Sequence, residues 1–203
     1  MAGVLPPSAA APADLDDLTL ARAQRGDARA QGALIRTHQR AVYALVSRML
    51  VGHPAQIDDV AQETFVKILR ALPRFDPAGA ASLNTWMLTI ATRTCLDVLR
   101  RPNRAGGEDP LHALESGLAP PDEIASGRET AARIERAMTA LPADHRAVLV
   151  LRAYHDLDYP EIASALEIAE GTVKSRLARA RAELRRVMDA SRESRESRER
   201  SER

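Results

Sequence analysis

The sequence has one cysteine, Cys95, and only 3% of its 203 residues are aromatic. A single cysteine excludes an intramolecular disulfide and any metal site made of several cysteines. No apolar run approaches the length needed to cross a bilayer, and the N-terminus lacks the basic start and apolar core of a signal peptide. We therefore expect a cytoplasmic protein in which Cys95 is a small apolar side chain on a helix.

The sequence also lacks the motifs of common enzyme classes. It contains no glycine-rich phosphate loop, no nucleophile elbow and no cluster of metal ligands. The five histidines are scattered along the chain: His38, His53, His112, His145 and His155. We expect no catalytic residue, cofactor, metal or small-molecule substrate, and an enzyme is the alternative that the sequence favours least.

Alternating strand patterns are missing, and helical periodicity dominates the chain. Prolines and glycines divide it into an N-terminus at 1–14, expected to be disordered, a helical block at 15–101, a linker at 102–127, a second helical block at 128–190 and a charged low-complexity tail at 191–203. The linker holds four prolines and four glycines, so we expect it to be flexible and to let the two blocks move independently. The sequence thus predicts an all-α fold of two small helical domains.

The first block predicts a succession of helices. Gly26 and Asp27 break the first helix, and Asp27 can cap the second. A third helix is expected at 57–72, a loop at 73–82 and a last helix at 83–101. Apolar residues of the second helix recur at helical spacing and are expected to face the core: Leu34, Val42, Leu45, Val46 and Met49.

The segment from Asp158 to Arg186 predicts two helices joined by a tight turn, which we place at 170–172. Asp158 is a favourable N-cap for the first helix, and Pro160 is tolerated in its first turn. This is the pattern of a helix-turn-helix, whose second helix enters the major groove of DNA. Apolar residues of that second helix recur at helical spacing and can pack inward: Val173, Leu177, Ala180, Leu184 and Val187.

The second helix of this pair is strongly basic. Residues 171–188 contain six lysines and arginines and one acid, Glu183, whereas the formal net charge of the whole chain is +1. Any affinity for nucleic acid must therefore come from local segregation of charge. A basic amphipathic helix is also common as a solvated surface helix, but the short preceding helix and the tight turn favour DNA binding here.

Two helices of the first block carry further candidates. The helix at 57–72 begins with an acidic and amide-bearing surface, although the helix dipole alone stabilises acids there by ~0.3–1 kcal/mol and explains them without a partner. In the helix at 83–101 the only tryptophan, Trp86, clusters with Leu83, Met87 and Ile90, as a core residue would. Its other faces carry hydroxyl and basic side chains that would suit a DNA backbone: Thr85, Thr89, Thr92, Arg93, Arg100 and Arg101.

Together these segments resemble bacterial sigma factors of the sigma-70 family, in the compact extracytoplasmic-function group. The matching stretches occur in the order of the family, with a linker between two domains, and cover nearly everything from about Leu18 to Met188. They are GDARAQGALI, DDVAQETFVKILRALPRFDP, LNTWMLTIATRTCLDVLRR and ALPADHRAVLVLRAYHDLDYPEIASALEIAEGTVKSRLARARAELR. One helix-turn-helix alone would be weak evidence, whereas this combination is specific.

The resemblance implies that residues 15–101 are sigma region 2 and residues 128–190 are region 4. In the family, the helix with the Asp-Val-x-Gln-Glu element docks on the clamp helices of the largest subunit of core RNA polymerase, which implies Asp58, Asp59, Gln62 and Glu63 here. The following helix and loop recognise and melt the −10 promoter element, which implies Phe75, Ser82, Thr85, Trp86, Thr89, Arg93, Arg100 and Arg101.

The second helix of the helix-turn-helix, in the same family, reads the −35 element. This implies the contact residues Thr172, Lys174, Ser175, Ala178, Arg179 and Arg181. The linker is expected to thread through the polymerase cleft. Relatives are commonly held inactive by an anti-sigma factor, sometimes at the inner membrane, so the expected partners are core polymerase, promoter DNA and an anti-sigma factor.

The chain departs from the family at several positions. Arg93 stands where many relatives have asparagine in the motif I-A-x-N, which leaves its contacts to the −10 element open. Gln31 and His38 replace common aromatic residues and mainly affect packing, and the small Ala178 leaves the −35 sequence preference open. An ordinary helix-turn-helix transcriptional regulator is the alternative, but it would need a receiver or ligand-binding domain upstream.

Overall fold

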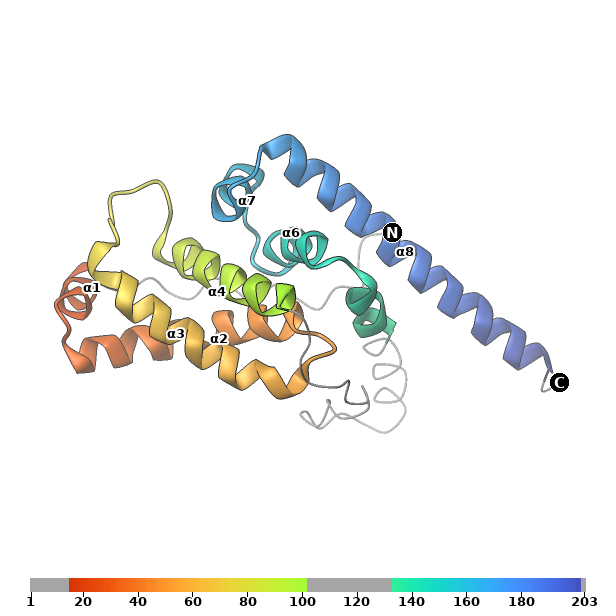
Figure 1. Cartoon of the computed structure of the whole chain (residues 1–203), viewed down its shortest axis with the longest axis horizontal. Helices are drawn as coiled ribbons and strands as arrows, with labels where there is room; N and C mark the ends of the chain where they lie inside the picture. The colour runs from red at the N-terminus through yellow and green to blue at the C-terminus, as the bar shows by residue number, and fades with distance from the viewer. Residues whose placement is uncertain (1–14, 102–132, 202–203) are drawn as a thin grey trace.

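The computed structural model describes residues 15–101 and 133–201, and over these ranges the chain is helical with no strand (Figure 1). The all-α fold predicted from the sequence is confirmed. The first half contains α1 (Asp17–Gln24), α2 (Ala28–Met49), α3 (Ile57–Ala71) and α4 (Leu83–Arg100), with short 3-10 turns at Pro54–Gln56 and Leu72–Arg74. The second half contains a helical stretch at 133–140, then α6 (Ala143–Tyr154), α7 (Tyr159–Leu166) and α8 (Glu170–Ser201).

Polar N-caps fix where these helices begin. The carboxylate of Asp16 accepts a hydrogen bond from the backbone N–H of Thr19, and that of Asp27 accepts one from the N–H of Ala30, both across 2.9 Å. The predicted cap at Asp27 is therefore confirmed. Gly26, directly before it, has φ +88°, a conformation that residues with a side chain seldom adopt.

The core of the first half forms where α2 packs against α1, α3 and α4. Cys95 is buried there as the small apolar side chain that the sequence predicts, and burial raises the pKa of its thiol to about 12. Each fully buried leucine or methionine contributes ~1.5–3 kcal/mol relative to exposure. The predicted inward residues of α2 are all buried: Leu34, Val42, Leu45, Val46 and Met49.

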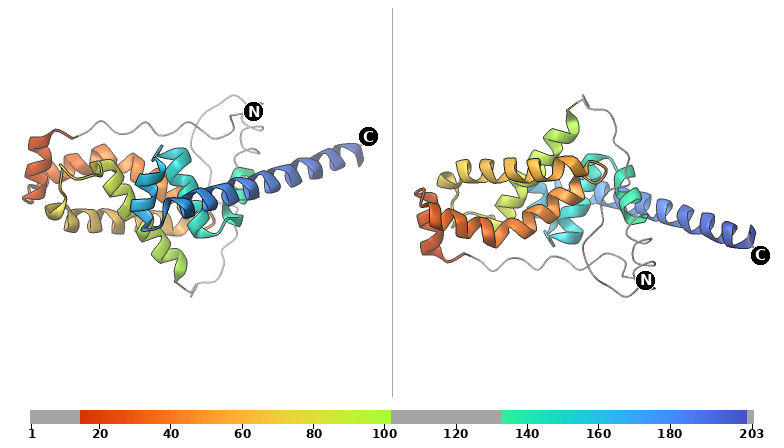
Figure 2. Two further views of the ribbon diagram at one scale, coloured as in Figure 1. Left: turned by 90° about the horizontal axis from the view of Figure 1, so that it is seen from above. Right: turned by 90° about the horizontal axis from the view of Figure 1, so that it is seen from below.

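The core of the second half joins α6, α7 and α8. Val173, Leu177 and Ala180 of α8 are buried as predicted, whereas Leu184 and Val187 are half-buried because α8 leaves the core at this point. Beyond them the helix projects as a straight extension (Figures 1 and 2). The turn of the helix-turn-helix lies at 167–169, not at 170–172, because α8 already begins at Glu170.

The two halves lie against each other in this structure. Helix α4 contacts α6 and α7, and α2 contacts α6 (Figure 2). Specific side-chain contacts join the two blocks in this arrangement, and the expectation that they move independently in solution stays a prediction. The predicted disordered N-terminus and the whole predicted linker lie outside the described residues, as do the side chains of the tail from residue 191 onward.

Candidate nucleic-acid and docking interfaces

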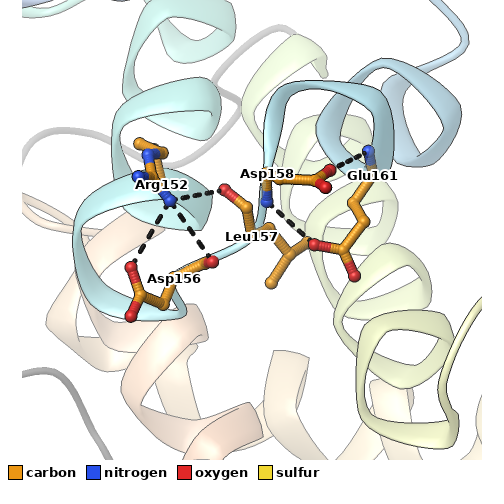
Figure 3. A network of polar contacts seen from close by, with 5 residues as sticks. All are labelled: Arg152, Asp156, Leu157, Asp158 and Glu161. Atoms are coloured by element: carbon orange, nitrogen blue, oxygen red, sulfur yellow. Dashed lines mark hydrogen bonds and ion pairs between the residues drawn. The ribbon is translucent and has the colours of Figure 1, made fainter.

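The helix-turn-helix is held by a network at the start of α7 (Figure 3). The carboxylate of Asp158 accepts from the backbone N–H of Glu161, and the Glu161 carboxylate accepts in return from the N–H of Asp158, each across 2.8 Å. Arg152 of α6 donates to the carbonyl oxygen of Leu157 at 3.1 Å and to that of Asp156 at 3.3 Å. This capping box and the arginine fix the approach of the chain into α7.

The end of α7 is equally defined. Glu167 adopts a left-handed conformation with φ 54°, and the N–H of Ile168 donates to the carbonyl of Ala163 across 3.0 Å. Such a left-handed C-cap satisfies carbonyls that the helix itself leaves free. The angle between α7 and α8 is therefore set by backbone geometry, so the side chains of α8 are presented in a fixed direction.

The outer face of α8 is basic and open. The predicted contact residues Lys174, Ser175, Ala178, Arg179 and Arg181 are exposed, and Thr172 is half-buried. The one acid of this segment, Glu183, accepts from Arg186 at 2.6 Å, and that hydrogen bond holds the pKa of the carboxyl below its usual value. Within residues 171–182 the face therefore carries no acid, and the exposed Glu170 at the start of α8 is the nearest preceding carboxylate of this helix.

Arg176 of the same helix has a different environment. Its guanidinium lies 3.3 Å from the carboxylate of Asp144, on the side of α8 that faces α6. Arg100 of α4 reaches the other oxygen of the same carboxylate, also across 3.3 Å. Asp144 thus links α4 to α8.

The predicted −10 residues form a connected group around the start of α4. Phe75 is buried and its ring lies 4.9 Å from that of Trp86, with an interplanar angle of 44°. Trp86 itself is half-buried, so part of its indole remains accessible next to Phe75. Ser82 is exposed and caps α4 by accepting from the N–H of Thr85 at 3.1 Å. The structure therefore brings the loop and the tryptophan together.

Further along α4 the predicted side chains are engaged within the protein. The Thr89 hydroxyl donates to the carbonyl of Thr85 across 2.9 Å. The Nε of Arg93 donates to the carbonyl of Ala165 in α7 at 3.1 Å. Arg100 and Arg101 are exposed at the end of the helix. Among the side chains proposed for DNA, Arg93 thus contacts α7, Arg100 contacts α6, and Thr89 bonds within α4.

The acidic surface of α3 lies on another side of the first half. Asp58, Asp59 and Gln62 are exposed, and Glu63 forms an ion pair with Lys67 across 3.0 Å. The hydroxyl of Tyr43 in α2 donates to Asp58 at 3.0 Å, and this hydrogen bond raises the pKa of the tyrosine. The four predicted docking residues therefore lie together on the first turns of one helix.

Sequence reasoning missed the apolar part of this surface. Tyr43 is 47% exposed and Val66 is 40% exposed, both unusually high for large apolar side chains. A hollow of about 650 Å³ adjoins Tyr43 and is lined by Ile35, Gln39, Arg40, Tyr43, Ala44, Ser47, Arg48 and Phe65. Helical periodicity could have revealed this apolar surface, because Tyr43 and Val66 do not fall on the apolar faces that α2 and α3 turn to the core.

The described ranges contain no group of three or more side chains that could hold a metal ion. They also contain no helix that is long and apolar enough to span a membrane.

Two family profiles match the chain: Sigma-70 region 2 over residues 34–105, and Sigma-70, region 4 over residues 131–184. The ECF RNA polymerase sigma-E factor of Salmonella typhimurium is 32% identical over 176 residues, which cover 82% of this chain and 90% of that protein. The RNA polymerase sigma-H factor of Pseudomonas aeruginosa is 35% identical over 178 residues, with the same coverage. Among solved structures, CnrH in complex with the cytosolic domain of CnrY aligns with a TM-score of 0.63 and 29% identity, covering 87% of this chain and 99% of CnrH.

Proposed function

Because this chain belongs to the sigma-70 family, in its extracytoplasmic-function group, we propose that the acidic surface of α3, the start of α4 with its loop, and the outer face of α8 carry the three contacts of a promoter-specificity factor. The protein is a sigma factor: it binds core RNA polymerase, reads the −35 element with its helix-turn-helix, and recognises and melts the −10 element. The observation that supports the residue assignment best is the open basic face of α8 behind a fully capped α7.

The docking contact is assigned to Asp58, Asp59, Gln62 and Glu63 on α3. Asp58, Asp59 and Gln62 are exposed, Glu63 is half-buried beside Lys67, and Tyr43 and Val66 add exposed apolar area. An interface with an apolar centre and a charged rim combines affinity with selectivity. We propose that this combined surface docks on the clamp helices of the polymerase.

The −35 contact is assigned to the outer face of α8. Lysine and arginine side chains there can neutralise phosphates, and each such contact releases counterions and steepens the salt dependence of binding. An arginine can also bind a guanine edge in the major groove through two hydrogen bonds. We assign Lys174 to a phosphate, Arg179 to a base edge, and the neighbouring Thr172, Ser175, Ala178 and Arg181 to groove and backbone contacts.

The −10 contact is assigned to the loop and the start of α4. Taking a base out of the stack costs a few kcal/mol. Stacking on an aromatic side chain returns roughly 1–3 kcal/mol per base. Trp86, supported by Phe75, supplies one such platform, so we propose that this factor melts DNA weakly by itself and depends on polymerase contacts and on a well-matched promoter.

The alternative assignments find little support. An ordinary helix-turn-helix regulator would not require the region 2 match over residues 34–105. The relatives are sigma factors, which are not enzymes. We propose that the chain has no catalytic activity of its own and needs no cofactor.

We further propose that the factor acts in the cytoplasm, where polymerase and promoter DNA meet. CnrH was solved in complex with the cytosolic domain of CnrY. By analogy, a protein of the anti-sigma type is the proposed regulator here, and a membrane anchor on that regulator would hold the factor at the inner membrane.

Co-purification with core RNA polymerase tests the proposed function. The full chain should form a stoichiometric holoenzyme that starts transcription from a subset of genomic fragments in a run-off assay. A chain that binds DNA fragments tightly without polymerase, and never joins the holoenzyme, would support the ordinary-regulator alternative instead.

A further inference from the structure

Helix α7 covers the promoter-facing side of α4 through a small set of polar contacts. The hydroxyl of Thr85, a residue only 6% exposed, donates to the Glu161 carboxylate across 3.1 Å. The guanidinium of Arg93 donates from Nε to the carbonyl of Ala165 at 3.1 Å and pairs from Nη2 with the Glu167 carboxylate at 3.0 Å. We call these five residues the latch.

The chemistry of the latch suits an arginine at position 93. The last carbonyls of a helix have no partner within it and form the negative end of its dipole, so a cation is stabilised there. Ala165 provides such a carbonyl, and the left-handed backbone of Glu167 brings a carboxylate beside it. A guanidinium can donate to both at once in its fork geometry, whereas the shorter asparagine common at this position of the family has one amide group.

Other contacts hold the two halves in the same arrangement. The buried Arg146 of α6 donates to the carbonyl of Met49 in α2 across 2.6 Å. The guanidinium of Arg48 in α2 lies 4.1 Å from the ring centre of Tyr154 in α6. Arg100 of α4 reaches Asp144 at 3.3 Å. The contact between the two halves is thus supported at separate points along α2 and α4, and the latch adds two points on α4, at Thr85 and Arg93.

The closed arrangement cannot serve a promoter. Elements at −10 and −35 are separated by roughly 85 Å of duplex, at 34–36 Å for each 10–10.5 base pairs. Helices α4 and α7 are in contact, so the reader of the −10 element and the helix-turn-helix would have to part before both elements are bound. The docking residues Asp58, Asp59 and Gln62 stay exposed in the closed chain.

We propose that Arg93 is a switch residue that binds either the end of α7 or promoter DNA. In the free factor the latch occupies Arg93 and Thr85, while the docking surface remains available to polymerase. Separation of the two halves on the polymerase releases both side chains to the −10 element. This proposal rests on the proposed function of α4 and adds to it a competition between an intramolecular partner and DNA.

The first test measures the distance between the halves in the full chain. Dyes are attached at Arg29→Cys on α2 and Asp189→Cys on α8, both exposed positions, while the buried Cys95 with its raised pKa stays unlabelled. Glu167→Gln should increase the open-to-closed ratio about 1.5- to 5-fold, as expected for a partly exposed ion pair. Glu170→Gln is the control, since it removes the same charge from a residue with no ion pair in the described part of the chain.

The pairing is tested by combining variants. Arg93→Asn should open the chain at least as far, because it also removes the bond to the Ala165 carbonyl, and the double variant should open it no further than Arg93→Asn alone, because the ion pair is already lost. Unchanged transfer efficiency in both single variants, or fully additive effects, would overturn the latch. The measurement uses neither DNA nor polymerase. The latch can therefore be refuted while the proposed function holds, and the proposed function can be refuted while the latch holds.

The second test asks whether the released arginine meets DNA. The probe is a pool of random 20-nucleotide single strands, titrated into the free full chain at fixed salt. Glu167→Gln should bind the pool about 1.5- to 5-fold more tightly than the unchanged chain, while Arg93→Asn opens without this gain. If Glu167→Gln opens the chain but leaves DNA affinity at the level of Glu170→Gln, the competition between α7 and DNA for Arg93 is refuted.

Discussion

Arg146 on α6, which is only 5% exposed, donates a hydrogen bond across 2.6 Å to the carbonyl of Met49, the last residue of α2. Its second terminal nitrogen donates to the carbonyls of Thr139 at 3.2 Å and Leu141 at 3.1 Å. Carbonyls at helix ends suit a cation because they carry the negative end of the dipole. Burial lowers the pKa of this guanidinium, which shows that desolvation is the cost of the link.

Replacing Arg146 by methionine should lower the free energy of unfolding by ~1–3 kcal/mol. The side chain keeps its apolar length, but buried carbonyls lose their donors. Urea unfolding followed by circular dichroism measures the change. Arg185→Met, at an exposed position of α8, is the control and should stay within about 0.5 kcal/mol of the unchanged chain. Equal midpoints for both variants would show that Arg146 contributes no net stability.

The docking surface is tested by the double change Gln62→Ala and Glu63→Lys. We expect holoenzyme formation to be lost, because the altered groups belong to the proposed contact and the lysine introduced in place of Glu63 would carry the opposite charge. The fold should persist, since the exposed Glu63–Lys67 pair contributes only about 0.3–0.5 kcal/mol. Competition with another sigma factor for core polymerase measures the effect, and Asp97→Lys on α4 provides a charge-matched control. Normal competition by the folded double variant would refute this surface.

Promoter reading by α8 is tested with Lys174→Ala and Arg179→Ala in the holoenzyme. A lost phosphate contact should reduce the slope of log affinity against log salt by about 0.9, uniformly across promoter sequences. A lost base contact should cost ~1–3 kcal/mol and relax preference at one base pair. Arg22→Ala, an exposed change on α1, serves as the control. If neither variant alters DNA affinity, the recognition face has been assigned to the wrong residues.

The melting role of Trp86 is tested by Trp86→Ala. We expect open-complex formation to become less favourable by ~1–3 kcal/mol, since one stacking platform is removed. Because Trp86 also packs on Phe75, a loss of stability must be separated from a loss of melting. A template already melted over the −10 region provides this separation: it should restore initiation by the variant. A defect of equal size on the melted template would show that Trp86 acts through folding alone.

His155 should make stability depend on pH. Burial, with a smaller contribution from Arg48, lowers its pKa to about 4 from an ordinary 6.5. The unfolded chain therefore takes up a proton first as the pH falls, and stability is lost between about pH 6.5 and 4, at up to about 1.4 kcal/mol per pH unit. His155→Gln should flatten this part of the curve in urea titrations from pH 7.5 to 4.5. His145→Gln keeps the buried imidazole and should retain the slope; an unchanged slope in His155→Gln would contradict the assignment.

Local structure could be predicted well from the sequence, because caps and apolar periodicity act over a few residues. Asp27 and Asp158 begin their helices as expected, and Val173, Leu177 and Ala180 are buried as the period requires. The turn between α7 and α8 was placed three residues too late. The unusual left-handed Glu167 ends α7, and no glycine marks that position in the sequence.

The contact between the halves could not be predicted in this way. Arg93 meets the carbonyl of Ala165, 72 positions away, and Arg146 meets that of Met49, 97 positions away. Neither acceptor is a side chain, so no pattern of residue types reveals the pairing. Arg93 could be recognised as a departure from the family, but its partner depends on how α7 ends in space.

The length of α8 makes it a lever on the helix-turn-helix. Ala180 is its last fully buried residue with a described side chain, and the helix continues to Ser201, roughly 30 Å further at 1.5 Å per residue. The recognition residues and this extension share one axis, so they turn together. If the axis of α8 tilts by about 10° at Ala180, the far end of the helix moves by roughly 5 Å. A small reorientation of α8 on the promoter would thus be magnified at its far end, beyond the recognition residues, where another molecule could sense it or resist it.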